Sequence, residues 1–314
     1  MPLNVLVFAE KPEILNDTLG FTSYLKEKVG ELKAYGFTIA PNIESVKEYS
    51  TLGTEKLYYA KVEKAFPDQL SIRLNQLIDE VKPDVIVGAA SKTGNEVLSK
   101  VAGLREIPML TEIVDVKVED SKLLFMRAIL GGRAISVEKP TLPVVVTVPL
   151  KKYQPPQPGD PCEIVEVELP ESKFSLVEVK EKTRGAVNIE EAEIVIGVGR
   201  GFRNKEDLRL AEELANLLGG AVGCSRPIAA DYGWLPEDSW IGISGKKVRA
   251  KLYMPIGISG APQHMTAAMD SKIIVAVNKD KSAPVFQYTD YGIVADLYKF
   301  LPILIQKIKE RLGK

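Results

Sequence analysis

Histidine occurs once in the 314 residues, as His264 within the stretch GISGAPQHM, residues 257–265. The apolar segment AKLYMPI precedes it, so the glycines and Pro262 predict that a strand ends here and a short helix begins near residues 261–262. An imidazole can act as a base, bind a metal or hydrogen-bond to a ligand. A lone histidine is more often a structural hydrogen-bonding group, but the glycine loop after a strand favours a role at a ligand.

Two further polar segments follow predicted strands. GVGRGF, residues 197–202, contains Arg200 in a G-x-G-x-G spacing that differs from the dinucleotide fingerprint. It predicts either a phosphate-binding loop, to which the arginine contributes, or a tight turn that packs a strand on a helix. GCSRP ends the next strand, where Ser225 and Arg226 fit either a ligand contact or a solvated surface.

Three more segments carry polar groups at predicted element ends. IGISGK places Ser244 in a tight turn that could by itself be any hairpin, and AVNKD and DYGIVADL, residues 276–280 and 290–297, follow the same pattern. Because the carboxyl ends of parallel strands meet at one edge of a sheet, the convergence of these segments fits a nucleotide-sized ligand. GAASKTGNE, residues 88–96, is interpreted as a structural turn because no second anion-binding segment supports it.

Several catalytic motifs are absent from the sequence. There is no G-x-x-x-x-G-K-[ST] loop, no H-E-x-x-H pair and no G-x-S-x-G elbow. A serine hydrolase that uses His264 would need such an elbow, so the sequence argues against that class.

The first half alternates predicted strands and helices, which indicates a mostly parallel sheet with helices on both faces. Strands are expected at residues 4–10, 56–62 and 83–90, and helices at 21–36, 67–82 and 94–104. From residue 109 to 150 consecutive strands are interpreted as a meander that joins this sheet. A proline-rich connection at 151–162 and a further strand at 174–180 follow.

The second half repeats the alternation. Strands are expected at residues 192–199, 221–225, 250–259, 273–278 and 283–289, and helices at 204–220 and 293–312. Asn204 and Asp207 predict a helix start, and Gly219 its end. The fold class is therefore α/β with two domains, each a mostly parallel sheet with helices on both faces. The boundary is expected near residues 181–192: residues 1–187 form an N-terminal domain without an expected ligand, and 188–314 a doubly wound domain.

Composition excludes several classes of function. The 41 basic and 42 acidic residues give a net charge of −1, which does not indicate binding to nucleic acid or to an anionic membrane. The longest apolar stretches are too short to span a bilayer, and the N-terminus lacks the features of a signal or transit peptide. Cys162 and Cys224 form neither a metal motif nor a disulfide framework. We expect a cytoplasmic protein without direct membrane insertion.

The C-terminal half closely resembles the alpha subunit of electron transfer flavoprotein. The matching segments are GVGRG, GCSRP, LYMPIGISGAPQH, AVNKD and APVFQYTDYGIVADL, in order and at family-like spacing, and the resemblance extends over roughly residues 190–314. The N-terminal half resembles the family more loosely, in pattern and length. The resemblance implies FAD bound by the C-terminal domain, and a beta subunit that completes a heterodimer with the N-terminal domain as scaffold.

The resemblance also implies roles for individual positions. Arg200 and Ser225 would contact the phosphate or ribityl region of FAD, and Arg226 would lie close to the isoalloxazine ring. Ser244 corresponds to a family hydroxyl that hydrogen-bonds to flavin N5.

The remaining implied contacts lie further along the chain. His264, with Gln263 beside it, would meet the pyrimidine end of the flavin near O2, while Ser259, Asn278 and Asp296 would contact the diphosphate and the adenosine. The full set of implied FAD-binding residues is Arg200, Ser225, Arg226, Ile241, Gly242, Ile243, Ser244, Ser259, Gly260, Ala261, Pro262, Gln263, His264, Asn278, Asp296 and Leu297.

Five positions depart from the family pattern. Ser244 replaces a common threonine, and Ile243 stands where glutamine is frequent. Pro255, Pro262 and Ala267 replace residues that the usual signature expects to be small, β-branched and glycine. Ile243 removes a polar contact to the ring, so the flavin potential of relatives cannot be transferred to this chain.

The implied function is that of an electron carrier rather than an enzyme. The chain would accept electrons from flavin dehydrogenases, such as the acyl-CoA dehydrogenases of fatty acid beta-oxidation, and pass them to a quinone reductase or a ferredoxin-type acceptor. The beta subunit would hold AMP or, in a bifurcating complex, a second FAD, and this chain leaves that choice open. The alternatives are a nicotinamide-dependent dehydrogenase, which lacks a proper G-x-G-x-x-G followed by a ribose-reading acid, and an adenine-nucleotide-binding module.

Overall fold

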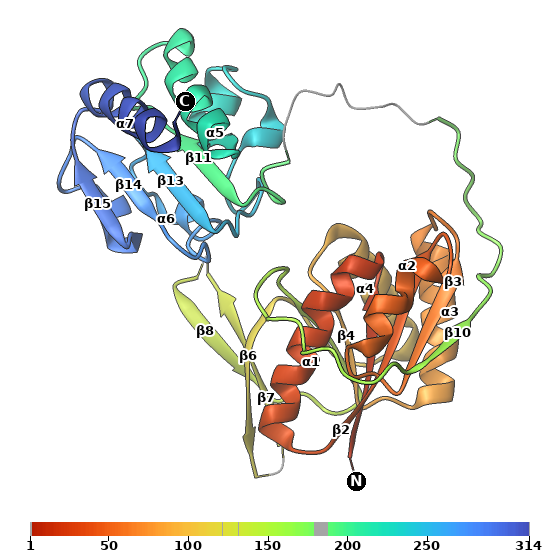
Figure 1. The fold of residues 1–314 in the computed structure, drawn as a ribbon. Helices are drawn as coiled ribbons and strands as arrows, with labels where there is room; N and C mark the ends of the chain where they lie inside the picture. The colour runs from red at the N-terminus through yellow and green to blue at the C-terminus, as the bar shows by residue number, and fades with distance from the viewer. Residues whose placement is uncertain (1, 121, 131, 179–187, 314) are drawn as a thin grey trace. The chain divides into compact units, whose positions relative to one another are not determined.

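The computed structural model describes residues 2–120, 122–130, 132–178 and 188–313. The chain divides into two compact units, Met1–Val179 and Lys180–Lys314 (Figure 1). The boundary predicted between residues 187 and 188 lies at the end of a stretch outside the described residues, and it stays a prediction. Within the described residues, no helix is long and apolar enough to cross a membrane.

The first unit is built on a sheet of seven parallel strands in the order β10-β3-β2-β1-β4-β9-β5. The strands are β1 (Leu3–Ala9), β2 (Leu32–Ala40), β3 (Lys56–Lys61), β4 (Val85–Ala89), β5 (Met109–Leu110), β9 (Val144–Val148) and β10 (Glu163–Glu166).

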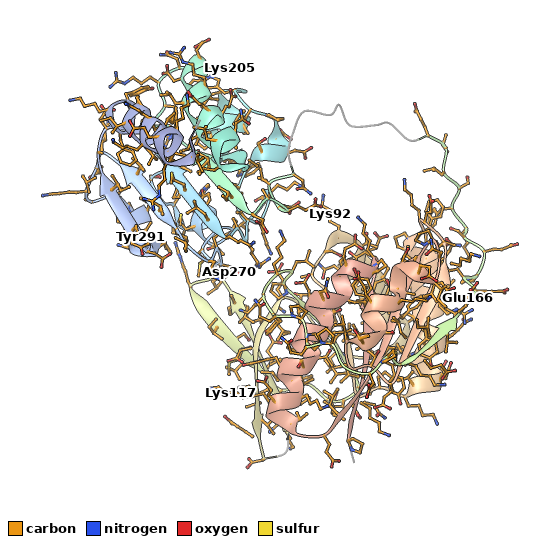
Figure 2. All side chains as sticks on the ribbon, viewed as in Figure 1. Lys92, Lys117, Glu166, Lys205, Asp270 and Tyr291 are labelled. Atoms are coloured by element: carbon orange, nitrogen blue, oxygen red, sulfur yellow. The ribbon has the colours of Figure 1, made fainter. Side chains whose placement is uncertain are left out.

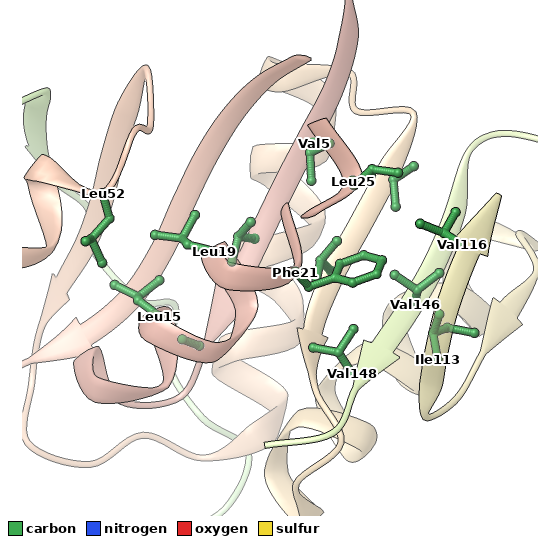
Figure 3. Packing of buried hydrophobic residues seen from close by; sticks show 14 of the residues in the cluster. Val5, Leu15, Leu19, Phe21, Leu25, Leu52, Ile113, Val116, Val146 and Val148 are labelled. Atoms are coloured by element: carbon green, nitrogen blue, oxygen red, sulfur yellow. The ribbon is translucent and has the colours of Figure 1, made fainter. Parts of the chain in front are cut away.

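Helices cover both faces of this sheet. They are α1 (Leu15–Val29), α2 (Glu44–Lys47), α3 (Pro67–Val81) and α4 (Lys92–Arg105). Because successive residues of a strand point to opposite faces, Val5 and Val7 of β1 pack in the cluster with α1, whereas Leu6 and Phe8 pack with α3 and α4. Helix α1 supplies Leu15, Leu19, Phe21 and Leu25 to the first cluster (Figure 3).

The helix predicted over residues 21–36 is wrong in its bounds. Helix α1 ends at Val29 because Gly30, at φ 86°, adopts a conformation that glycine tolerates and most residues do not. Gly36 lies in strand β2 instead, where a Cβ would approach Leu57 Cδ1 to 2.8 Å. The glycine therefore serves the packing of a strand and does not end a helix.

The predicted meander does not join the main sheet. Strands β6 (Ile113–Glu119), β7 (Lys122–Ile129) and β8 (Ala134–Glu138) form an antiparallel sheet of their own, and of the strands in residues 109–150 only β5 and β9 belong to the parallel sheet. Val116 and Phe125 reach the core, whereas Ile135 and Val137 of β8 are exposed. The meander thus extends away from the core.

The strand expected at residues 174–180 is also wrong for its described part, residues 174–178, which form no strand. Strand β10 takes the edge position instead. It pairs with β3, and the Tyr59 hydroxyl of β3 donates a hydrogen bond to Glu166 at 2.5 Å; Glu166 is labelled in Figure 2. Val177 is 96% exposed, so the apolar run that suggested a strand is not buried.

The second unit contains five parallel strands in the order β12-β11-β13-β14-β15. These are β11 (Ile194–Val198), β12 (Ala221–Cys224), β13 (Leu252–Ile256), β14 (Val275–Asn278) and β15 (Tyr291–Val294). The chain moves from β11 to β12 on one side and then to β13 on the other. The gap between β11 and β13 is therefore a topological switch point, where doubly wound sheets bind ligands.

Two long helices, α5 (Arg209–Leu218) and α7 (Leu297–Leu312), pack on one face of this sheet. The other face carries a cluster around Tyr253 of β13, with residues that flank the short helix α6 (Pro262–Met265) in space and in sequence. The predicted helix start is confirmed, because Asn204 and Asp207 form a reciprocal cap before α5. Gly219, in the left-handed region, ends α5 as expected.

One predicted strand of this unit is wrong. Residues 284–288, within the stretch expected as a strand, form a 3₁₀ helix, Pro284–Tyr288, and β15 follows it. Pro284 has no N–H to donate to a strand, and the amide of Val285 bonds to the Ser259 carbonyl at 3.0 Å. Helix α7 consequently begins at Leu297 rather than residue 293, after the cap residue Asp296.

Candidate functional site

A cavity of about 640 Å³ lies at the carboxyl edge of the second unit's sheet. Each of its five strands contributes the residues that follow it: Gly201 after β11, Ser225 after β12, Ser259 after β13, Lys279 after β14 and Asp296 after β15. The volume lies within the range of small-molecule and cofactor sites. The convergence of the polar segments on one edge was predicted from the sequence, and the structure brings them together.

Most residues predicted to bind FAD line this cavity. The exceptions are Gly260 and Pro262, which do not contribute to its wall. Gly260 has φ 85°, and a Cβ there would lie 2.2 Å from the Val285 nitrogen, so this glycine allows two loops to meet. The predicted residues on the wall are Arg200, Ser225, Arg226, Ile241, Gly242, Ile243, Ser244, Ser259, Ala261, Gln263, His264, Asn278, Asp296 and Leu297.

Glycines let the loops after β11 and β13 touch at the switch point. The Gly201 amide donates to the Gly257 carbonyl at 2.9 Å. A Cβ on Gly201 would lie 2.5 Å from Gly257 Cα, and one on Gly199 would lie 2.4 Å from the Gly257 oxygen. The G-x-G-x-G turn therefore packs one strand end against another, and Arg200, exposed within it, also faces the cavity. The packing interpretation of this turn is confirmed, while its contact with a phosphate stays a prediction.

The cavity wall carries more positive than negative charge. Of its two acids, Asp296 already caps α7 by accepting the Tyr298 amide at 2.8 Å. Hydrogen bonds from Ser282 hold the pKa of the other, Asp280, below its ordinary value. This balance suits an anion such as a diphosphate. The charged residues of the wall are Arg200, Arg203, Arg226 and Lys279 against Asp280 and Asp296.

Two aromatic residues of the wall were missed by the sequence reasoning. The Arg226 guanidinium lies 5.5 Å from the centre of the Trp240 ring, and Arg203 lies 5.1 Å from that of Tyr298. The Tyr298 hydroxyl also donates to Asp207 at 2.7 Å and accepts the Arg203 amide at 2.7 Å. Only the adjacency of Trp240 to the IGISGK turn could have indicated a role in the sequence.

Asn278 joins the loops that follow β13 and β14 through its side-chain amide. Its Nδ2 donates to the Ile258 carbonyl at 2.9 Å, and its Oδ1 accepts the Asp280 amide at 3.0 Å. This residue therefore shapes the cavity edge, while its contact with a ligand stays a prediction.

The side chains of four uncharged polar residues on the wall form no hydrogen bond to another described residue. They come from four separate segments, so donors and acceptors remain available on several sides of the cavity. These residues are Ser225, Ser244, Ser259 and Gln263.

His264 is 7% exposed and lies on α6 at the cavity wall. Its Nε2 is 2.6 Å from the Tyr253 hydroxyl, and its buried Nδ1 has no hydrogen-bond partner in the described part of the chain. Burial lowers the pKa of His264 to about 4, an effect that the nearby Ile241 carbonyl offsets only in part. The ring is therefore neutral near pH 7. A buried nitrogen without a protein partner can hydrogen-bond to a water or to a ligand atom in the cavity.

Cys224, the buried one of the two cysteines, is unsuited to thiol chemistry. Burial raises the pKa of the Cys224 thiol to about 12, so its thiolate is not accessible near neutral pH. No group of three or more His, Cys, Asp or Glu side chains suitable for a metal ion occurs among the residues that the structure describes.

The fold and the cavity define a doubly wound α/β protein with a site for a nucleotide-sized anion at its switch point. Two family models match the chain: "Electron transfer flavoprotein domain" over residues 17–172, and "Electron transfer flavoprotein FAD-binding domain" over residues 188–269. The second match spans the cavity segments from β11 to α6.

Similar proteins extend over nearly the whole chain. "Electron transfer flavoprotein subunit alpha" of Bacillus subtilis (strain 168) is 32% identical over 290 residues, which cover 90% of this chain and 89% of that protein. The protein of the same description from Thermoanaerobacterium thermosaccharolyticum is 30% identical, covering 98% of both chains. "Protein FixB" of Clostridium saccharobutylicum is 31% identical, covering 98% of this chain and 96% of that protein. The chain belongs to the electron transfer flavoprotein family, as an alpha-type subunit.

Proposed function

We propose that this chain is the FAD-carrying subunit of a heterodimeric electron transfer flavoprotein. The observation that carries the proposal is the cavity at the switch point, which lies largely within the segment matched by the FAD-binding family domain. Its excess of cationic side chains suits a diphosphate, and its buried, unpartnered His264 Nδ1 suits a polar ring edge.

The residues present fit FAD in three respects. Arg200 lines the cavity beside Gly201 and Gly257, whose loops touch, so a cationic fork and glycine backbone lie together where a phosphate could bind. Ser225 and Ser259 offer free hydroxyls nearby, and Ser244, Arg226 and His264 form the part of the wall that we assign to the isoalloxazine ring. Bound flavin would supply electron transfer in one- or two-electron steps. The protein's contribution is to hold the ring, exclude water and set the charge around it.

We further propose that a beta subunit completes the functional protein and that the heterodimer accepts electrons from flavin dehydrogenases, such as acyl-CoA dehydrogenases. A quinone reductase or a ferredoxin-type protein would then receive them. The family relationship supports an electron-carrying role. The choice between simple transfer and bifurcation depends largely on residues of the beta subunit.

The test is co-expression of this chain with its beta subunit, followed by a visible absorption spectrum and a count of released flavin and AMP. We expect a yellow 1:1 complex with one FAD per copy of this chain. AMP in the complex would indicate simple transfer, and a second FAD would indicate a bifurcating complex. A colourless complex that binds a nicotinamide cofactor or only an adenine nucleotide would reject the proposal.

A further inference from the structure

The hydroxyl of Tyr253 is confined to a single hydrogen-bond partner. Tyr253 is completely buried on β13, and its Oη lies 2.6 Å from His264 Nε2. Gly197 on the neighbouring strand β11 leaves it room, because a Cβ there would lie 2.5 Å from the same oxygen. Among the described residues, no other hydrogen bond of this hydroxyl is formed.

This geometry decides which atom carries the proton. A buried tyrosine hydroxyl has one hydrogen to donate, and leaving it without an acceptor is costly. His264 Nε2 is the one acceptor within reach of Tyr253 in the described part of the chain. If Nε2 were itself protonated, the two hydrogens would compete and the tyrosine hydrogen would have no acceptor. The hydroxyl therefore donates, Nε2 accepts, and the neutral ring holds its hydrogen on Nδ1.

We propose that Tyr253 is a positioning residue that holds His264 as the neutral tautomer protonated at Nδ1, so that the histidine presents a hydrogen-bond donor to an acceptor of the cofactor. The part of this statement that concerns the cofactor rests on the proposed function, whereas the tautomer is a property of the chain. The buried Nδ1 without a partner is the group that this tautomer turns into a donor. The Ile241 carbonyl near the ring is compatible with the same proton position.

This arrangement has a consequence for electron transfer. A neutral imidazole whose only exchangeable hydrogen is fixed can stabilise added negative charge through a dipole without itself changing charge. Tyr253 would keep the imidazole hydrogen on Nδ1 by occupying the other ring nitrogen, Nε2. A tyrosine that only fills space in the core would leave the tautomer free to change.

The single histidine makes a direct test possible. The full chain, labelled with ¹⁵N-histidine and without a histidine tag, is assembled with FAD and an unlabelled beta subunit, so that His264 gives the only imidazole signals. Nitrogen chemical shifts and one-bond N–H couplings identify which ring nitrogen is protonated. We expect Nδ1 to be protonated and Nε2 bare at pH 7. A ring protonated at Nε2 would overturn the proposal without any variant.

Variants test the role of the tyrosine itself. Tyr253→Phe should convert the single tautomer into a mixture or into the Nε2-protonated form, and should weaken FAD binding about fivefold, as expected for one hydrogen bond. Tyr291→Phe is the matched control, because Tyr291 on β15 is 64% exposed and also loses one hydroxyl (Figure 2). An unchanged tautomer in Tyr253→Phe would overturn the proposal. If Tyr253→Phe does not fold, the wild-type spectrum still decides. If the chain holds no flavin, the proposed function fails while the tautomer remains measurable.

Discussion

The guanidinium carbon of Arg226 lies 5.5 Å from the centre of the Trp240 ring, and both residues line the cavity. Arg226 is otherwise exposed and forms no ion pair with another described residue. A cation over an indole face gains about 0.5–2 kcal/mol, depending on how far the pair is desolvated. Trp240 therefore limits the positions that a long, flexible side chain can adopt at the cavity.

Replacement of Arg226 should lower the potential at which the bound flavin accepts its first electron. Uptake of an electron without a proton adds negative charge, which a nearby guanidinium stabilises. A loss of about 1 kcal/mol corresponds to roughly 40 mV for a one-electron couple. We expect Arg226→Ala to lower the potential by tens of millivolts and Arg226→Lys to fall in between, as measured by spectroelectrochemical titration at one salt concentration.

Trp240→Leu serves as the companion variant, since it keeps the charge but removes the aromatic face. It should cause a smaller shift than Arg226→Ala. An unchanged potential in Arg226→Ala with FAD fully bound would mean that this arginine acts at a phosphate or at the surface.

Gly201→Ala should abolish stable FAD binding. The new Cβ would lie 2.5 Å from Gly257 Cα, and backbone atoms cannot move apart without separating the two loops at the switch point. Gly103→Ala is the control, because Gly103 lies within α4 with nothing within 4 Å of a Cβ. That change should stabilise the first unit by about 0.5–1 kcal/mol and leave flavin content unchanged. Retention of FAD in Gly201→Ala would show that the loops are not essential to the site.

The site could be predicted from sequence because it depends on strand ends. Each of the segments around Arg200, Ser225, Ser259 and Asn278 follows a short apolar run that is unmistakably a buried strand. Parallel pairing then brings their carboxyl ends to one edge, whatever the exact bounds of the elements. Trp240 and Tyr298 escaped this reasoning because they reach the cavity through the packing of loops and of a helix start, which no local pattern encodes.

The end of helix α1 was harder to predict, because two glycines near it could each end a helix. The helix was expected to reach Gly36, but Gly30 ends it, and the pairing of Gly36 with Val7 and Leu57 shows that this residue lies in a strand. Similarly, the run from Phe174 to Val177 has the composition of a strand, but β10 already occupies the sheet edge beside β3. In both cases packing against neighbouring strands, and not the local sequence, determined which residues form a strand.

Ser91→Ala should destabilise the first unit without releasing FAD. Ser91 caps α4 by accepting the Gly94 amide at 2.8 Å, and loss of such a cap costs about 1 kcal/mol. Its segment, GAASKTGNE, is interpreted as a structural turn, so the double variant with Thr93→Ala should also keep its flavin and potential. Urea unfolding followed by circular dichroism and a flavin count measure the two effects. Loss of flavin would mean that the first unit carries a ligand of its own.

Acid should weaken the second unit through His264. The folded-state pKa of about 4 lies below the ordinary value of 6.5, so between these two values the unfolded chain binds more protons than the folded one. The stabilisation that the neutral His264 gives the folded state is therefore complete above about pH 6.5, and it is lost as the pH falls toward 4. Because no other histidine is present, no second imidazole titrates in this window.

His264→Gln should remove this part of the acid sensitivity. The pKa difference predicts that wild type loses about 2 kcal/mol of unfolding free energy between about pH 7.5 and about pH 5, and that the variant loses less by that amount. Tryptophan fluorescence during urea unfolding is a selective probe, because both tryptophans, Trp234 and Trp240, belong to the second unit. Equal losses of unfolding free energy in the two proteins would mean that His264 is protonated in the folded state as easily as in water. The burial of its ring against Tyr253 should prevent such protonation.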